Sequence, residues 1–287
     1  MFNKPYEIRN IYKQISERLL SIYELNEADS IAEILLESKV PKLRLKLISD
    51  PNLSIEEKDV QDLFEMLLEL KEHKPIQYVL GETEFMGLTF KVNENVLIPR
   101  PETEELISWI LQEDLSQKTV LDIGTGSGCI PISIVKKGSA SVKVFASDFS
   151  KAALELAMQN AQSNNVKIEF IQDDILNPST TNQKYDIIVS NPPYVRESEK
   201  ALMSENVLNF EPEIALFVKD SDPLIFYKAI MDYSNLYLNQ SGLLFLEINE
   251  NFGMELMTLL NRNGFREIEL RKDLSGKERM IKARKIL

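Results

Sequence analysis

The first 75 residues carry apolar side chains at the three- and four-residue spacing of amphipathic helices. Ser54 followed by Glu57 has the form of a capping box, which predicts a helix start just after Ser54. The apolar stripes comprise Tyr12, Ile15, Leu19 and Ile22; Ile31, Ile34 and Leu35; and Val60, Leu63, Phe64, Leu67 and Leu68. We therefore predict a small helical bundle over residues 1–75, in which most of these side chains pack in the core.

The hydrophobic period shortens to two over residues 82–98, around Gly87. Residues 76–98 are therefore predicted to form a β-hairpin linker. Beyond it, Pro101 can occupy the first position of a helix, because its missing N–H costs nothing there. Glu102 and Glu104 would then lie at the positive end of that helix.

From residue 119 onward, short apolar runs alternate with helical patterns, an order typical of βαβ units and a mostly parallel sheet. Segments 265–271 and 278–286 have no crossover helix between them, so they should pair antiparallel. Residues 99–287 are predicted to form one α/β domain with a Rossmann-like, mostly parallel seven-stranded sheet and an antiparallel last strand. The other predicted strands are 119–123, 142–147, 166–171, 185–190 and 242–248, and the predicted helices are 128–137, 151–164, 223–238 and 252–263.

Composition restricts the classes of function. The chain of 287 residues has a net charge of −12, which argues against a broad surface for duplex DNA. One cysteine and one histidine exclude an internal disulfide and a zinc site of the Cys/His type, and we expect no metal. The first residues lack the apolar core of a secretory signal, and no run of about 18 apolar residues suggests a membrane span. We expect a cytoplasmic protein without a membrane partner.

A glycine-rich segment follows the first predicted strand of the α/β domain. It contains Gly124, Thr125, Gly126, Ser127 and Gly128. Glycines let a backbone turn sharply and approach a ligand, and open α/β sheets bind ligands beyond the carboxyl ends of their strands. Asp122, just before the loop, would repel a pyrophosphate but suits a cationic ligand such as S-adenosylmethionine. The alternative is a tight strand-to-helix turn without a ligand.

Acidic residues also end the next two predicted strands. Asp148 could accept hydrogen bonds from ribose hydroxyls, although it could instead cap the following helix in competition with Ser150. Asp173 or Asp174 could meet an adenine amino group, with Ile175 packed on the base. The alternative is that these two acids only form hydrogen bonds with the backbone of their own loop.

Asn191-Pro192-Pro193-Tyr194 directly follows the apolar strand 185–190. Two prolines fix the backbone and donate no N–H, so the turn is stiff. The Asn191 side-chain oxygen and the Pro192 carbonyl could each accept an N–H from a planar NH2 group, on which Tyr194 could stack. Such acceptors orient a poorly nucleophilic nitrogen and stabilise the charge that develops on it during methyl transfer. These four residues are therefore the predicted catalytic and substrate-binding residues, and Asn191 is also expected near the cofactor.

Taken alone, this motif fits adenine-N6 methyltransferases as well as glutamine-N5 ones. Further segments narrow the choice, because the chain from about residue 75 onward resembles the release-factor glutamine methyltransferase family. The resemblance rests on the glycine loop, on Ser190 to Tyr194, and on residues 75–81, 84–88, 96–104, 210–212, 245–248 and 272–276. The sheet with its antiparallel last strand is likewise the pattern of class I S-adenosylmethionine methyltransferases.

The resemblance implies methylation of the glutamine amide in the Gly-Gly-Gln motif of peptide chain release factors. S-adenosyl-L-methionine would be the cofactor and S-adenosyl-L-homocysteine the product. It also implies that the N-terminal bundle docks the release factor, and that Arg100 and Glu102 lie near the cofactor and substrate. A surface ion pair is the alternative for these two residues. No direct contact with nucleic acid is expected.

This chain departs from the family pattern at three places. Residues 217–222 lack the glycines that often follow Phe-Glu-Pro, Asn249 stands where glycine is usual, and Ile175 stands at a position that is sometimes aromatic. Three other classes of function remain open. These are an adenine-N6 methyltransferase acting on nucleic acid, a cofactor-binding or docking protein without activity, and a NAD dehydrogenase, for which nothing supplies a hydride-handling acid or base.

Overall fold

The computed structural model describes residues 6–286, which form two compact units. Among the described residues, the smaller unit comprises 6–81 and 205–210, and the larger one comprises 82–204 and 211–286. The predicted bundle ended at residue 75, whereas the structure divides the chain after residue 81. The first five residues of that bundle and residue 287 lie outside the described residues.

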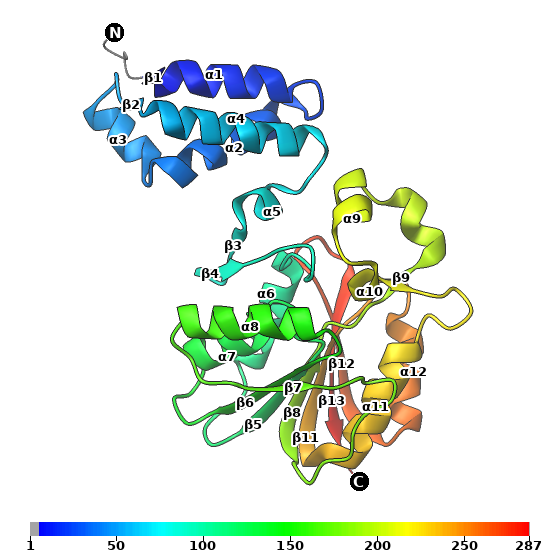
Figure 1. Ribbon diagram of the computed structural model, residues 1–287. Helices are drawn as coiled ribbons and strands as arrows, with labels where there is room; N and C mark the ends of the chain where they lie inside the picture. The colour runs from blue at the N-terminus through cyan, green and yellow to red at the C-terminus, as the bar shows by residue number, and fades with distance from the viewer. Residues whose placement is uncertain (1–5, 287) are drawn as a thin grey trace. The chain divides into compact units, whose positions relative to one another are not determined.

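The smaller unit is helical, as its apolar stripes predict (Figure 1). Its helices are α1 (Ile8–Leu19), α2 (Leu25–Lys39), α3 (Leu43–Ser49), α4 (Glu57–Lys71), α5 (Ile76–Leu80) and α9 (Glu205–Phe210). A two-residue strand, β1 (Tyr6–Glu7), pairs antiparallel with β2 (Ser54–Ile55). The core combines buried aliphatic side chains of α1, α2 and α4, such as Ile15, Leu35 and Leu63.

Two details of this region differ from the prediction. The capping box was wrong: Ser54 lies in β2, and α4 begins at Glu57 with Glu56 as its N-cap residue. Local pairing of β1 with β2 thus takes Ser54 out of the helix. Residues 76–80 form the short helix α5 rather than part of a hairpin, and Gly81 ends it with a φ of 74°.

The predicted hairpin lies in the larger unit, where β3 (Glu82–Phe85) pairs with β4 (Leu88–Lys91). Met86 and Gly87 at the turn both have positive φ, of 54° and 69°, which is the geometry of a tight two-residue hairpin turn. The Phe85 and Phe90 rings meet edge to face at 5.9 Å. Both rings are buried in the same core cluster as the helix that starts at Pro101, so the hairpin shares the core of the larger unit.

The larger unit contains a seven-stranded sheet in the order β12-β13-β11-β8-β5-β6-β7. The five strands from β11 to β7 are parallel, and β13 lies between β11 and β12, antiparallel to both. The mostly parallel sheet and its antiparallel last strand are therefore confirmed. The strands are β5 (Thr119–Ile123), β6 (Lys143–Asp148), β7 (Glu169–Gln172), β8 (Tyr185–Ser190), β11 (Leu238–Glu247), β12 (Phe265–Lys272) and β13 (Glu278–Lys285).

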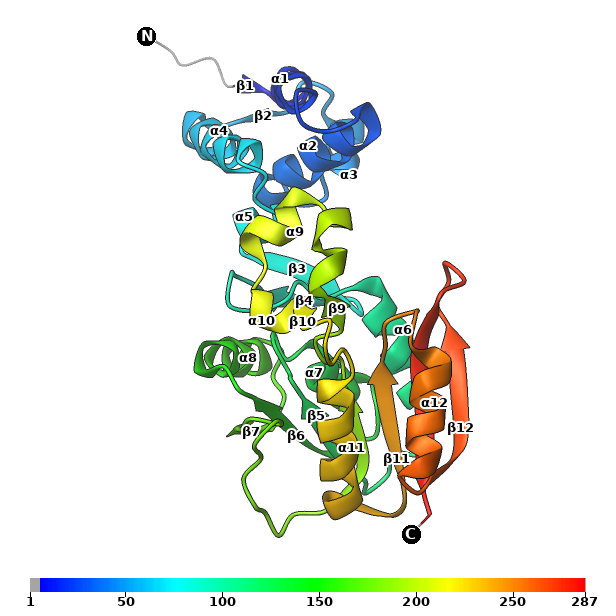
Figure 2. The ribbon, with the colours of Figure 1, turned by 90° about the vertical axis from the view of Figure 1, so that its right-hand side faces the viewer.

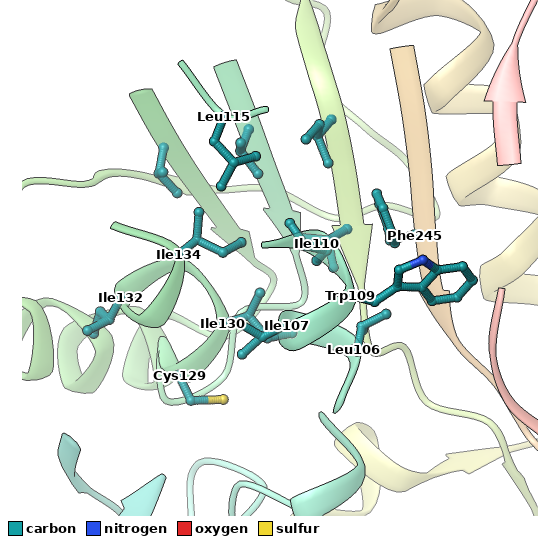
Figure 3. Packing of buried hydrophobic residues seen from close by; sticks show 14 of the residues in the cluster. Leu106, Ile107, Trp109, Ile110, Leu115, Cys129, Ile130, Ile132, Ile134 and Phe245 are labelled. Carbon is teal, nitrogen blue, oxygen red and sulfur yellow. The ribbon is translucent and has the colours of Figure 1, made fainter. Parts of the chain in front are cut away.

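Helices cover both faces of this sheet, so its central strands are apolar on both sides. Successive residues alternate between two cores: Val120 packs with side chains of α6, α7 and α8, and Leu121 packs with those of α11 and α12. In Figure 2, α11 and α12 lie on the side of the sheet that faces the viewer. On the first face, the Trp109 and Phe245 rings meet edge to face at 5.6 Å (Figure 3). The covering helices are α6 (Pro101–Ile110), α7 (Cys129–Lys137), α8 (Lys151–Ser163), α11 (Ile225–Tyr237) and α12 (Gly253–Arg262).

Between β8 and α11 the chain forms short elements that the sequence pattern did not predict. Two-residue strands pair in parallel, and two short helical segments accompany them. These elements are β9 (Val195–Arg196), η1 (Glu197–Leu202), α10 (Glu213–Leu216) and β10 (Phe217–Val218). None of the helices within residues 6–286 has the length and apolar character needed to cross a bilayer.

Candidate active site

A cavity of about 340 Å³ opens at the carboxyl ends of β5 and β8, the last residues of which, Ile123 and Ser190, line it. The strand order reverses direction between these two strands, which is where open α/β sheets bind ligands. The Ser190 hydroxyl donates to the Ile123 carbonyl at 2.7 Å and ties the two strand ends together. The volume is in the range of small-molecule and cofactor sites.

The glycine loop forms one wall of this cavity. Gly124, Gly126 and Gly128 have positive φ of 75°, 53° and 80°, a conformation that L side chains rarely adopt. A Cβ at Gly124 or Gly126 would meet nothing within 4 Å, so the backbone there is open to a ligand. A Cβ at Gly128 would lie 3.1 Å from the Ala157 Cβ, so this third glycine serves packing of the loop against α8.

Asp122 lies beneath the loop rather than in the cavity wall, and it is fully buried. Burial raises the pKa of its carboxyl to about 7, and the charge of Asp148 adds to the increase. The Thr125 hydroxyl opposes the increase, although it forms no hydrogen bond of normal geometry with the carboxylate. Among the described residues, both Asp122 oxygens and the hydroxyls of Thr125 and Ser127 lack a hydrogen-bond partner. Thr125 and Ser127 line the cavity, and Asp122 lies next to them outside its wall.

The acidic residues that end β6 and follow β7 do line the cavity. Asp148 accepts hydrogen bonds at 2.8 Å from the backbone N–H groups of Gly126 and Ser150, so it holds the glycine loop in place. Burial raises the pKa of Asp148, and those N–H groups oppose the increase. The cap of α8 is Ser150, whose hydroxyl accepts from the Ala153 N–H at 3.2 Å. The lone pairs of Asp148 that these contacts leave free fit the predicted ribose contact.

Asp173 and Asp174 make the local contacts that the alternative interpretation described. Asp173 Oδ1 accepts from the Ser179 N–H at 2.9 Å, and Asp174 Oδ1 accepts from the Leu176 N–H at 3.0 Å. Both acids nevertheless line the cavity together with Ile175. Each therefore stabilises its loop with one oxygen, and the roles predicted for Asp174 and Ile175 toward adenine stay predictions.

The motif Asn191–Tyr194 separates this cavity from a second, smaller one of about 50 Å³. Asn191 and Pro192 line both cavities, whereas Pro193 lines only the larger and Tyr194 only the smaller. The motif thus stands between a space of cofactor size and a space the size of a small planar group. Tyr194 lines the smaller space, and its predicted contact with the substrate stays a prediction.

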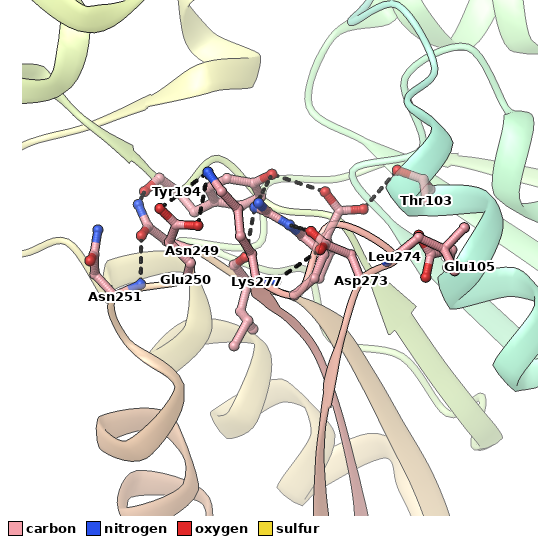
Figure 4. A network of polar contacts seen from close by, with 12 residues as sticks. Thr103, Glu105, Tyr194, Asn249, Glu250, Asn251, Asp273, Leu274 and Lys277 are labelled. Carbon is pink, nitrogen blue, oxygen red and sulfur yellow. Dashed lines mark hydrogen bonds and ion pairs between the residues drawn. The ribbon is translucent and has the colours of Figure 1, made fainter.

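A network of polar side chains that includes Thr103 contacts Tyr194 of the motif (Figure 4). Glu247 is fully buried at the end of β11, and its Oε2 accepts from the Thr103 hydroxyl at 2.7 Å. Its Oε1 accepts from the Tyr194 hydroxyl at 2.9 Å. Asn191 Nδ2 donates to the Thr103 hydroxyl oxygen at 3.3 Å. Both ends of the motif are therefore connected to one buried carboxylate.

Arg100 is part of the site, but its ion pair is not a surface pair. Its guanidinium donates to Glu211, whose side chain is 1% exposed, and the Ile98 N–H donates to the other Glu211 oxygen at 3.1 Å. Arg100 lines both cavities. Glu102 lies in the first turn of α6 and lines neither cavity, although its charge contributes to raising the pKa of Glu247. The structure therefore brings Arg100, but not Glu102, to the cavity wall.

Sequence reasoning assigned no role to Thr103, Glu211 or Glu247. Glu247 had a signal, because a charged residue at the end of the wholly apolar run Leu243–Leu246 is costly to bury without a function or a partner. Glu211 likewise precedes Pro212 in a segment that the family resemblance included. Thr103 had no signal of its own, since its partners lie 88 and 144 residues away.

These residues fit S-adenosylmethionine. The backbone is open beside Gly124 and Gly126, and Asp148 lines the cavity. Thr125 and Ser127, which line it too, and the buried Asp122 carry polar atoms without a partner among the described residues. An acidic, phosphate-repelling floor matches a cationic ligand better than a dinucleotide. The fold and this site define a class I S-adenosylmethionine-dependent methyltransferase.

Comparisons with known proteins agree with this class and give the family. The family described as "Methyltransferase small domain" matches residues 102–210, and "PrmC N-terminal domain" matches residues 10–81. A release factor glutamine methyltransferase of Flavobacterium psychrophilum is 46% identical, with 96% of this chain and 98% of the relative covered. The protein of that name from Bacteroides thetaiotaomicron is 37% identical, with 96% and 99% covered. The chain belongs to the release factor glutamine methyltransferase family.

A solved structure supports the fold independently of sequence. A methyltransferase from Pyrococcus furiosus superimposes with a TM-score of 0.52 at 15% identity, covering 71% of this chain and 91% of that one. At this level of identity the likeness concerns the architecture alone. It agrees with the parallel sheet and antiparallel last strand described above.

Proposed function

We propose that this protein transfers a methyl group from S-adenosylmethionine to the side-chain amide nitrogen N5 of a glutamine in peptide chain release factors. Family membership supports the reaction and the substrate class. The observation that carries the proposal is the position of Asn191 and Pro192, which line both the larger and the smaller cavity. A side-chain amide in the smaller space would present its nitrogen at the boundary with the larger one.

The chain supplies orientation and charge stabilisation. The Asn191 side-chain oxygen and the Pro192 carbonyl accept the two N–H bonds of the substrate amide and direct its nitrogen toward the larger cavity. These acceptors stabilise the positive charge that develops on nitrogen, and the proton can leave after transfer. Tyr194 closes the smaller cavity, and its hydroxyl is held by Glu247 at 2.9 Å. A strong general base is therefore not required.

Residues of the larger cavity would hold the cofactor. The backbone at Gly124 and Gly126 is open enough to admit it, Asp148 would accept hydrogen bonds from its hydroxyl groups, and Asp174 and Ile175 would border the base. When bound, S-adenosylmethionine supplies an electrophilic methyl group on a sulfonium centre. In its ionised form, the buried carboxylate of Asp122 would contribute a negative potential beneath the loop, which favours a cationic ligand.

We infer that the two units have different roles. We infer that the helical unit, which the family description "PrmC N-terminal domain" matches over residues 10–81, docks the release factor, while the larger unit methylates it. The net charge of −12 supports a protein partner rather than direct contact with nucleic acid. A cytoplasmic location would place the enzyme with its substrate.

Methyl transfer from labelled S-adenosylmethionine tests this proposal. The purified chain is incubated with a release factor, with the same factor carrying Gln→Ala in its Gly-Gly-Gln loop, and separately with DNA and RNA. We expect label in the unmodified factor alone. Equal labelling of both factors would refute glutamine as the acceptor. Labelling of nucleic acid without protein would favour the adenine-N6 reaction instead.

A further inference from the structure

We propose that Glu247, acting through Thr103, is the positioning residue that fixes the direction of the Asn191 amide, so that its oxygen rather than its nitrogen faces the substrate. This inference rests on the proposed function, in which Asn191 accepts an N–H of the substrate amide. An asparagine side chain has a nearly symmetrical shape but carries a donor at one end and an acceptor at the other. Something in the protein must therefore distinguish the two orientations.

The Thr103 hydroxyl distinguishes the two orientations of the Asn191 amide. The Thr103 hydroxyl has one proton, and its oxygen lies 2.7 Å from Glu247 Oε2. An ionised carboxylate only accepts, so the hydroxyl proton must point to Glu247. The Thr103 oxygen can then only accept at its other contact, which is Asn191 Nδ2 at 3.3 Å. Because the amide is planar, holding Nδ2 on Thr103 turns Oδ1 away from it.

The same carboxylate also fixes Tyr194 at the other end of the motif. The Tyr194 hydroxyl donates to Glu247 Oε1 at 2.9 Å, so the two oxygens of Glu247 each receive one hydroxyl proton. The Tyr227 hydroxyl donates to the Glu247 backbone carbonyl at 3.2 Å and anchors the end of β11. Glu247 is 1% exposed, so these contacts are shielded from the bulk solvent. One buried group therefore orients the residues that bound the substrate cavity.

Protonation of Glu247 would remove the preference of the Asn191 amide for one orientation. A protonated carboxyl can donate to Thr103, which could then donate to Asn191 Oδ1 and reverse the amide. Burial raises the pKa of Glu247, which brings this event closer to neutral pH, and Glu102 on α6 acts in the same direction. Arg279 on β13 opposes it, as do the hydroxyls of Thr103 and Tyr194. The arrangement thus predicts a loss of turnover on acidification.

Replacing Thr103 tests the relay directly. Thr103→Val keeps the side-chain shape but removes the hydroxyl, so we expect kcat with a release factor to fall roughly 10- to 100-fold, as for loss of one orienting hydrogen bond. The KM for the release factor and the Kd of S-adenosylmethionine should change much less. Thr103→Ser should recover most of the lost turnover. Thr258→Val, which removes an exposed hydroxyl on α12, is the matched control and should leave kcat unchanged.

Glu247→Gln provides a second, independent measurement. At saturating cofactor, wild-type kcat should decline as the pH falls through the ionisation of Glu247, whereas the variant should be slower but lack this decline. The inference would be overturned if the kcat of Thr103→Val equalled that of the wild type. It would also be overturned if the kcat of Glu247→Gln declined at low pH as the wild-type kcat does. Wild-type enzyme that methylates no release factor would instead refute the proposed function. A Thr103→Val protein that fails to fold leaves the pH profile of Glu247→Gln to decide.

Discussion

The Arg100 guanidinium is paired with Glu211, a carboxylate that lies 111 residues further along the chain and is 1% exposed. The Ile98 N–H completes the environment of that carboxylate at 3.1 Å. This pair joins the start of α6 to the segment before α10. It therefore holds the wall that Arg100 contributes to both cavities.

Removing Arg100 should destabilise the protein as well as the site. Arg100→Ala leaves the buried Glu211 charge with a single backbone donor, so we expect the free energy of unfolding to fall by about 2 kcal/mol. Denaturant unfolding measures this change. Lys228→Ala, which breaks an exposed pair with Asp222, should have little effect and serves as the control. Equal losses in the two variants would contradict the structural role of the Arg100 pair.

Asn191→Ala should separate binding from turnover. The substitution removes the acceptor proposed for the substrate amide, so we expect kcat to fall about 100- to 1000-fold, the magnitude typical of losing one charge-stabilising group. Cofactor affinity, measured by calorimetry, should remain within a few-fold of wild type because the glycine loop and Asp148 are untouched. Unchanged turnover would remove Asn191 from the mechanism.

The raised pKa of Asp122 predicts an unusual dependence of the free energy of unfolding on pH. Burial raises its pKa from 3.8 to about 7, so the folded state holds a proton that the unfolded state has already lost. The stability of the wild type should therefore decline as the pH rises from about 4 through about 7, by up to about 4 kcal/mol from this group. Well below pH 4 the carboxyl is protonated in both states, so its ionisation no longer affects the free energy of unfolding.

The variant Asp122→Asn isolates this effect, since it carries no charge at any pH. We expect it to be more stable than the wild type at pH 8, and the difference to disappear near pH 4. Denaturant unfolding of both proteins at the two pH values measures it. A difference that is the same at both pH values would exclude a buried ionisable Asp122 as its cause.

The glycines of the loop should respond differently to alanine. Gly124→Ala meets open space, so the cost to stability should be about 1 kcal/mol from the positive φ alone, while cofactor affinity falls. Gly128→Ala adds contacts at 3.1 and 3.2 Å with Ala157 and Ile132, so its cost should be roughly 2–3 kcal/mol. Thermal unfolding and cofactor titration measure the two effects. The reverse order of stabilities would contradict this division between ligand approach and packing.

Much of the sheet could be predicted because its central strands are apolar on both faces. The predicted bounds of β5 and β8, 119–123 and 185–190, match the structure. The edge strand β7 was less predictable: it begins at Glu169 rather than residue 166. β11 begins at Leu238, four residues before the predicted start, and continues through Ser241 at a positive φ of 64°. Polar residues in that irregular part hide it from a pattern search.

Short elements and long-range contacts could not be predicted from the sequence pattern. α10 has four residues and β9 and β10 have two each, too few for any periodicity to emerge. The motif Asn191–Tyr194 could be located from its residues alone. Its support could not, because Thr103 and Glu247 meet across 144 residues and only the folded sheet brings them together. Asp122 was expected to face the ligand, yet strand alternation buries it beneath the loop.

The position of β13 has a consequence for how the larger unit forms. This strand, Glu278–Lys285, fills the gap between β11 and β12 and pairs with both. Until it arrives, β11 and β12 each present an unpaired edge, a template for pairing with other chains. The sheet can therefore be completed only after nearly the whole chain is available. A chain truncated before residue 278 would lose Arg279 and become prone to aggregation rather than merely less active.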